Sequence, residues 1–85
     1  MLTPANTVHL SRLRWHCRRG MRELDVLLTR YLEQTYPGAS STQQLAFESL
    51  LDLQDPLILA YLTGSAVPDR QEIQDVIQQL AKLGA

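Results

Sequence analysis

Apolar residues recur at helical spacing in five stretches of this sequence, and helix-breaking residues separate the stretches. Helices are predicted over about 8–18, over about 21–35, from near residue 41, over about 56–62 and from near residue 69. The clearest stripe consists of Ile73, Val76, Ile77 and Leu80, spaced as one face of a helix requires. No stretch alternates as a strand does. We therefore predict an all-α fold, a compact five-helix bundle with two longer N-terminal helices.

Polar, proline and glycine residues predict where these helices begin and end. The predicted N-caps are Ser41, Asp55 and Asp69. Ser41 and Asp69 are followed three residues later by Gln44 and Glu72, which is the pattern of a capping box. The predicted stops are Tyr36-Pro37-Gly38, Thr63-Gly64 and Gly84.

The first helix has a single apolar face and one large aromatic residue beside it. Leu10, Leu13 and Cys17 share the face, and Trp15 is predicted to be a partly buried anchor with its indole N–H at the rim. Contact of Trp15 with a partner is the alternative. Residues 1–7 contain a proline and no periodicity, so we predict a flexible tail on a single domain that covers residues 1–85.

Composition adds an uneven charge to this picture. The chain has 85 residues, of which 45% are hydrophobic, and a formal net charge of −1. Residues 8–25 carry five arginines and two acids, whereas the rest of the chain carries three basic and seven acidic residues. A basic helical edge on an acidic body favours one specific face for an acidic or anionic partner.

The cysteine count and the hydropathy pattern argue against several classes of protein. Cys17 is the single cysteine, so no internal disulfide can form, and a reducing, cytoplasmic location is expected. The longest apolar run, Leu57 to Leu62, is far shorter than the ~20 residues that cross a bilayer, so no direct membrane insertion is expected. The N-terminus does not have the pattern of a signal peptide.

The sequence contains no complete catalytic or metal site. His9, His16 and Cys17 are the only soft ligands, and a structural zinc site needs four. We therefore expect no metal, no bound cofactor and no enzymatic activity. The arginines could bind nucleic acid, but they are spread around the helix and the isoelectric point is near 6.0. Nucleic-acid binding is kept only as an alternative.

Gly20 interrupts the helical pattern at the densest run of charge. Glycine inside a helix costs about 1 kcal/mol relative to alanine, so its presence indicates a helix junction or the close approach of another backbone. Arg19 and Glu23 are four residues apart, but an arginine that precedes a glutamate is the weaker orientation of a helical pair. An arginine, a bare backbone and a carboxylate side by side favour a docking site for a partner chain.

At these residues the chain resembles the SdhE (YgfY) family of flavin-assembly factors, to which the mitochondrial succinate dehydrogenase assembly factor two is related. The family signature is Arg-Gly-x-x-Glu, present here as Arg19-Gly20-Met21-Arg22-Glu23. The match extends over Trp15 to Asp25, and Phe47 to Asp52 followed by Asp55-Pro56 is similar to a second family block. The resemblance covers about residues 8–83.

The chain departs from the family pattern at two positions. Leu57 stands where the family usually carries an acidic residue after the proline, which weakens any role of the second block as a polar contact surface. Tyr61 stands where the family usually has a tryptophan, and a tyrosine can keep most of the packing role.

The resemblance implies a binding protein rather than an enzyme. Family members bind the flavoprotein subunit of succinate dehydrogenase, and often of fumarate reductase, and promote covalent attachment of FAD to a histidine of that subunit. By carry-over, Arg19, Gly20 and Glu23 are the expected docking residues, with Arg18 and Asp25 as neighbours. We expect a monomer, because the apolar faces are consumed by the bundle. The second hypothesis is the antitoxin of a toxin–antitoxin pair, a label that some relatives have carried.

Overall fold

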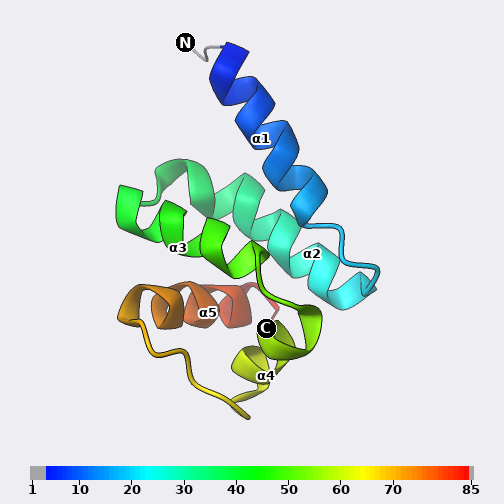
Figure 1. Cartoon of the computed structure of the whole chain (residues 1–85), viewed down its shortest axis with the longest axis vertical. Helices are drawn as coiled ribbons and strands as arrows, with labels where there is room; N and C mark the ends of the chain where they lie inside the picture. The colour runs from blue at the N-terminus through cyan, green and yellow to red at the C-terminus, as the bar shows by residue number, and fades with distance from the viewer. Residues whose placement is uncertain (1–3, 85) are drawn as a thin grey trace.

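Helices form almost all of the regular structure in residues 4–84, the part of the chain that a computed structural model describes (Figure 1). The α-helices are α1 (Pro4–His16), α2 (Arg22–Arg30), α3 (Ser41–Leu51), α4 (Asp55–Thr63) and α5 (Gln71–Leu83). α2 continues through a π-helical turn, η1 (Tyr31–Thr35), into a 3₁₀ turn, η2 (Tyr36–Gly38). No strand occurs within this part of the chain, so the all-α prediction is confirmed.

The core lies where α5 packs against α2, α3 and α4. α5 lies against both α2 and α3, and α4 lies at the end of the molecule opposite α1 (Figure 1). The rings of Tyr31 and Phe47 stack at the centre, with their centroids 4.5 Å apart. The largest fully buried aliphatic side chains around them are Leu24, Leu28, Leu50, Ile58, Val76 and Leu80. These are the apolar positions that helical spacing selects, so burial of one face of each helix explains the bundle.

α1 projects from one end of the bundle and is attached mainly through its C-terminal half (Figure 1). Leu13 and Cys17 are buried and Leu10 packs against the core, as predicted. The helix begins at Pro4 and not near residue 8 as predicted, whereas residues 1–3 of the expected tail lie outside the described part. The predicted anchoring of Trp15 is also wrong, because this side chain is 69% exposed. With 13 residues, α5 is as long as α1, so length does not single out the N-terminal helices.

The N-caps of α3, α4 and α5 each lie one residue away from the predicted cap. The cap of α3 is Ser40, whose Oγ accepts the Gln43 N–H at 3.2 Å, one residue before the predicted Ser41. Gln54 and Arg70 occupy the N-cap positions of α4 and α5, so the predicted caps Asp55 and Asp69 are wrong. The stop at Gly64 is confirmed, because this residue has a left-handed φ of +84°.

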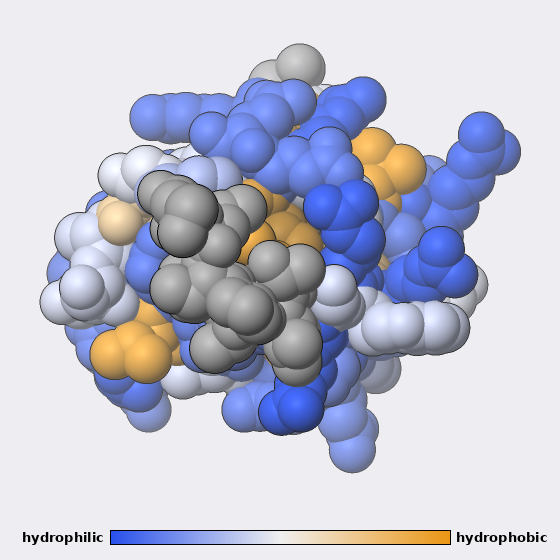
Figure 2. All heavy atoms as spheres, turned by 90° about the horizontal axis from the view of Figure 1, so that it is seen from above, coloured by the Kyte–Doolittle hydropathy of each residue, from blue (hydrophilic) through white to orange (hydrophobic). Residues whose placement is uncertain are grey.

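The outer surface is mostly hydrophilic, with separate apolar patches in the view from above (Figure 2). The large hydrophobic side chains that remain exposed are Trp15, Met21, Val26, Leu45, Leu57 and Val67. Within residues 4–84, no helix combines the length and the apolar character needed to span a bilayer.

Candidate functional site

The segment between α1 and α2 is a sharp junction built around Gly20. α1 ends when the Cys17 N–H bonds back to the Leu13 carbonyl oxygen at 3.1 Å. Gly20 then adopts a left-handed φ of +83°, and extended Met21 occupies the N-cap position of α2. The predicted helix junction is therefore confirmed. A Cβ atom placed on Gly20 meets no atom within 4 Å, so the requirement within this chain is one of backbone conformation and not of space.

The side chain of Arg19 turns inward and ties this junction to the end of α3. Its Nη2 donates hydrogen bonds to the carbonyl oxygens of Leu51 at 2.6 Å and Leu53 at 2.7 Å. Its Nε lies 3.2 Å from Oδ1 of Asp55, but the N–H is misaligned, so this contact is an ion pair without a hydrogen bond. The Arg19 side chain is only 16% exposed. It satisfies carbonyls that the end of a helix leaves open and places a cation at the negative end of the α3 dipole.

Asp25 completes the same junction from α2. Its Oδ1 accepts the backbone N–H of Arg19 at 2.6 Å, and the carboxylate is partly buried. Asp25 stands in the first turn of α2, where the positive end of the helix dipole favours an acid, and its carboxylate also bonds directly across the turn. Arg19 and Asp25 therefore fix the shape of the loop that presents Gly20.

Three of the expected docking residues, Arg18, Gly20 and Glu23, are exposed to solvent. The Arg18 guanidinium lies over the ring of Trp15, 5.2 Å from its centroid, in a cation–π arrangement. Glu23 makes no hydrogen bond or ion pair with any side chain in the described part of the chain. Because α1 and α2 are separate helices, Arg19 and Glu23 do not form the pair that a continuous helix would allow.

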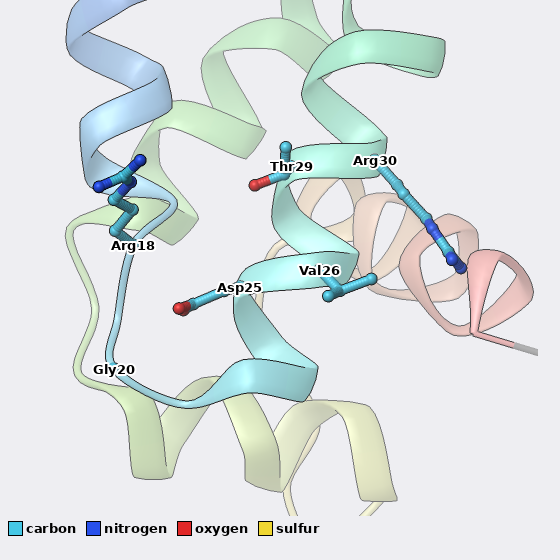
Figure 3. A pocket seen from close by; sticks show the side chains of 6 residues that line it. All are labelled: Arg18, Gly20, Asp25, Val26, Thr29 and Arg30. Atoms are coloured by element: carbon cyan, nitrogen blue, oxygen red, sulfur yellow. The ribbon is translucent and has the colours of Figure 1, made fainter.

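A shallow depression of about 610 Å³ lies beside Gly20, on the outer side of α2 (Figure 3). Its lining residues are Arg18, Gly20, Asp25, Val26, Thr29 and Arg30. Asp25 and Thr29 point toward the segment that follows α1, whereas Arg30 extends toward the end of α5 (Figure 3). Glu23 lies outside it, in a second depression of about 590 Å³ that shares Val26 and Arg30.

Sequence reasoning singled out the junction but missed Val26, Thr29 and Arg30. One signal was available for Val26. It falls outside the stripe formed by Leu24, Leu27 and Leu28, so an apolar residue stands on the side of α2 that faces solvent. Val26 is 40% exposed in the structure.

A second polar cluster links α1 and η2 to the C-terminal half of α3. The Tyr36 hydroxyl donates a hydrogen bond to Oε2 of Glu48 at 2.6 Å, and Nε2 of His9 lies 3.3 Å from the same oxygen. Burial, followed by the bond to Glu48, raises the pKa of Tyr36 above its ordinary value of 10.0. No sequence pattern indicates this contact, because its members are far apart along the chain. Of the two family departures, Leu57 is 38% exposed and Tyr61 packs against the core.

The remaining candidate ligands do not form a reactive centre. In the part of the chain that the structure describes, no group of three or more histidine, cysteine and acidic side chains could hold a metal ion. Burial raises the pKa of the Cys17 thiol from 9.0 to about 11, so this thiol stays protonated at neutral pH. An inert buried thiol is a packing residue and not a nucleophile.

Comparison with known proteins points to one family over most of the chain. A family model described as the flavinator of succinate dehydrogenase matches residues 11–83. The FAD assembly factor SdhE of Methylococcus capsulatus is 43% identical over 72 residues, which cover 85% of this chain and 87% of that protein. The SdhE proteins of Colwellia psychrerythraea (40% over 75 residues, 88% and 82%) and Coxiella burnetii (36% over 74 residues, 87% and 90%) match similarly. The chain therefore belongs to the family of succinate dehydrogenase flavinators, the FAD assembly factors SdhE.

Proposed function

We propose that this chain binds the flavoprotein subunit of succinate dehydrogenase and promotes the covalent attachment of FAD to that subunit. The observation that carries the proposal is the family match over residues 11–83, which includes the Arg19 to Glu23 motif. Relatives at 36–43% identity bear the name FAD assembly factor. The chain acts as a chaperone-like binding protein and not as an enzyme, and the flavin and the histidine that it modifies belong to the partner.

The docking surface that we propose is the outer face of the junction between α1 and α2. Gly20, Glu23 and Arg18 are exposed and can meet a partner chain, and Gly20 leaves its backbone open to close approach. Arg19 and Asp25 contribute by fixing the loop, because their polar groups are engaged within the chain. The proposed surface is thus presented on a rigid turn, which lowers the entropy lost on binding.

Three finer points belong to the same proposal. The flavoprotein of fumarate reductase is a second client, as the family resemblance implies. The chain is a monomer, which is supported by the burial of the apolar helix faces in its own core. Its location is cytoplasmic, which is supported by a free, buried Cys17. The antitoxin alternative finds no support among the relatives named above.

Covalent flavin fluorescence on a denaturing gel tests the proposal. The cognate flavoprotein subunit is made in cells that lack this factor, and then together with wild-type chain, Glu23→Ala or Gly20→Arg. We expect the wild type to restore the fluorescent band and the folded variants to fail. Equal flavin in every lane, including the lane without the factor, would show that the chain does not promote attachment.

A further inference from the structure

We propose that the depression beside Gly20 binds an acidic segment of the flavoprotein, and that Val26 and Arg30 of α2 are part of the docking surface. This inference rests on the proposed function. It extends the surface from the Arg19 to Glu23 motif by two further turns along α2. The depression is continuous with Gly20, which is one of its lining residues (Figure 3).

The cations of this depression are Arg18 and Arg30. Elsewhere, Arg14 pairs with Glu33, Arg19 with Asp55 and Arg70 with Glu72. In residues 9–84, where side chains are described, neither Arg18 nor Arg30 forms an ion pair. Arg30 donates only to the Leu83 carbonyl oxygen at 3.2 Å, and Arg18 lies over Trp15.

The single acid of the depression does not balance these cations. Asp25 accepts the Arg19 backbone N–H and is committed to the loop. Arg18 and Arg30 lie on opposite sides of the depression, with Val26 between them (Figure 3). Charge complementarity therefore favours carboxylates that approach from the partner and meet an arginine on each side.

Val26 gives this surface an apolar centre. Arg22, Val26 and Arg30 are four residues apart, so they form one row on the exposed side of α2. Val26 and Arg30 line depressions on both sides of this row, so the row is a ridge between two hollows. A β-branched residue is a weaker helix former than Ala, Glu or Lys, so helix stability does not explain an exposed valine here. An apolar contact flanked by arginines is the composition of a protein interface.

The lining also indicates what kind of ligand fits. Arg18, Gly20, Val26 and Arg30 are all exposed, so the hollow is open to solvent along its length. A small molecule is usually held in a cavity that buries most of its surface, which this depression cannot do. A chain segment with acidic side chains on either side of an apolar one fits both the shape and the charge.

Binding measurements with the purified flavoprotein subunit test the inference. We expect Arg30→Glu and Val26→Asp to weaken binding about tenfold or more and Arg30→Lys to keep most of the affinity. Lys82→Glu is the matched control, because it makes the same change in net charge on an exposed residue of α5 and should leave binding unchanged. Added salt should weaken wild-type binding more than Arg30→Glu binding. Circular dichroism checks that each variant is folded.

The outcomes separate this inference from the proposed function. If the wild type neither binds the flavoprotein nor restores flavin, the proposed function fails. If the wild type binds, Glu23→Ala is impaired, and Arg30→Glu and Val26→Asp bind like the wild type, the function stands and this inference is overturned. If Arg30→Glu changes only self-association in sedimentation, the occupant is a second copy of the chain, and the inference is also overturned.

Discussion

An arginine in a binding motif can affect the binding of a partner indirectly, by fixing the shape of the loop that carries the motif. The Arg19 guanidinium donates to two carbonyl oxygens at the end of α3 and pairs with Asp55, so it joins the α1–α2 junction to residues 51–55, more than 30 residues further along the chain. Its backbone N–H holds Asp25 on the opposite side of the turn. The sequence identified Arg19 as important, but the sequence alone did not show that its contacts are internal.

Arg19→Ala is therefore expected to lower the free energy of unfolding by about 2–4 kcal/mol. The loss combines two charge-assisted hydrogen bonds with two carbonyl oxygens left without a donor. Arg19→Lys should recover part of it, because the ammonium group keeps a cation and N–H donors for these carbonyls but lacks the length and planar geometry of the guanidinium. Urea unfolding measures the effect. Exposed Arg22→Ala serves as the control and should stay within about 0.5 kcal/mol of the wild type.

Substitutions at Gly20 separate backbone strain from contact with a partner. Because a Cβ at this position meets no neighbour and φ is +83°, Gly20→Ala and Gly20→Arg carry the same backbone cost, about 1–2 kcal/mol. The two variants should thus unfold at similar temperatures. Only the arginine side chain should also block a close approach, so Gly20→Ala should keep more flavin attachment. A far lower unfolding temperature for Gly20→Arg than for Gly20→Ala would contradict this account.

At the scale of the helices, apolar periodicity correctly predicted where the helices lie, whereas the local cap patterns predicted the wrong N-cap residues. The apolar stripes follow from burial of one face, which is a property of the sequence within each helix. The cap patterns failed because their acids bond elsewhere. Asp55 pairs with the distant Arg19, and Glu72 accepts a hydrogen bond from Arg70, only two residues before it, instead of completing a capping box. Trp15 was assigned to the rim because a large aromatic usually gains by burial, but α1 projects from the bundle and leaves its far side without a neighbour.

Two leucines on different helices, Leu13 and Leu45, should respond very differently to truncation. Leu13→Ala removes a buried contact between α1 and the core and should cost about 2–5 kcal/mol. Leu45→Ala should cost less than about 0.5 kcal/mol, because Leu45 is 62% exposed on α3. Thermal or urea unfolding of both variants measures the difference. Equal losses would mean that α1 contributes no more to the stability of the bundle than an exposed surface contact does.

Across the whole molecule, the candidate site could be predicted only in part. The run of charge around Gly20 indicated the junction, because a glycine and the charged residues beside it can be recognised within one stretch of sequence. The depression on α2 combines Arg18, Val26 and Arg30, whose proximity depends on how α1 turns into α2 and on the end of α5. Of the basic run predicted over residues 8–25, Arg18 lines this depression, whereas Arg14 and Arg19 pair with Glu33 and Asp55.

One buried thiol and two buried tyrosine hydroxyls make the stability of the bundle sensitive to alkaline pH. Burial raises the pKa of Cys17 from 9.0 to about 11 and raises the pKa of Tyr31 and Tyr36 above 10.0. In each case the folded state retains a proton that the unfolded chain releases. The stability that these groups contribute is therefore complete below the unfolded pKa values and is lost as pH rises through the folded ones.

We accordingly expect the free energy of unfolding to fall with pH above about 9, where the thiol of the unfolded chain begins to ionise. Cys17→Ala should reduce this slope between pH 9 and pH 11, although its stability at pH 7 is lower because a buried side chain is shortened. Urea unfolding at a series of pH values measures both quantities. If the slopes of the wild type and Cys17→Ala coincide over that range, Cys17 is not the group that retains the proton, and the tyrosines must account for the alkaline loss.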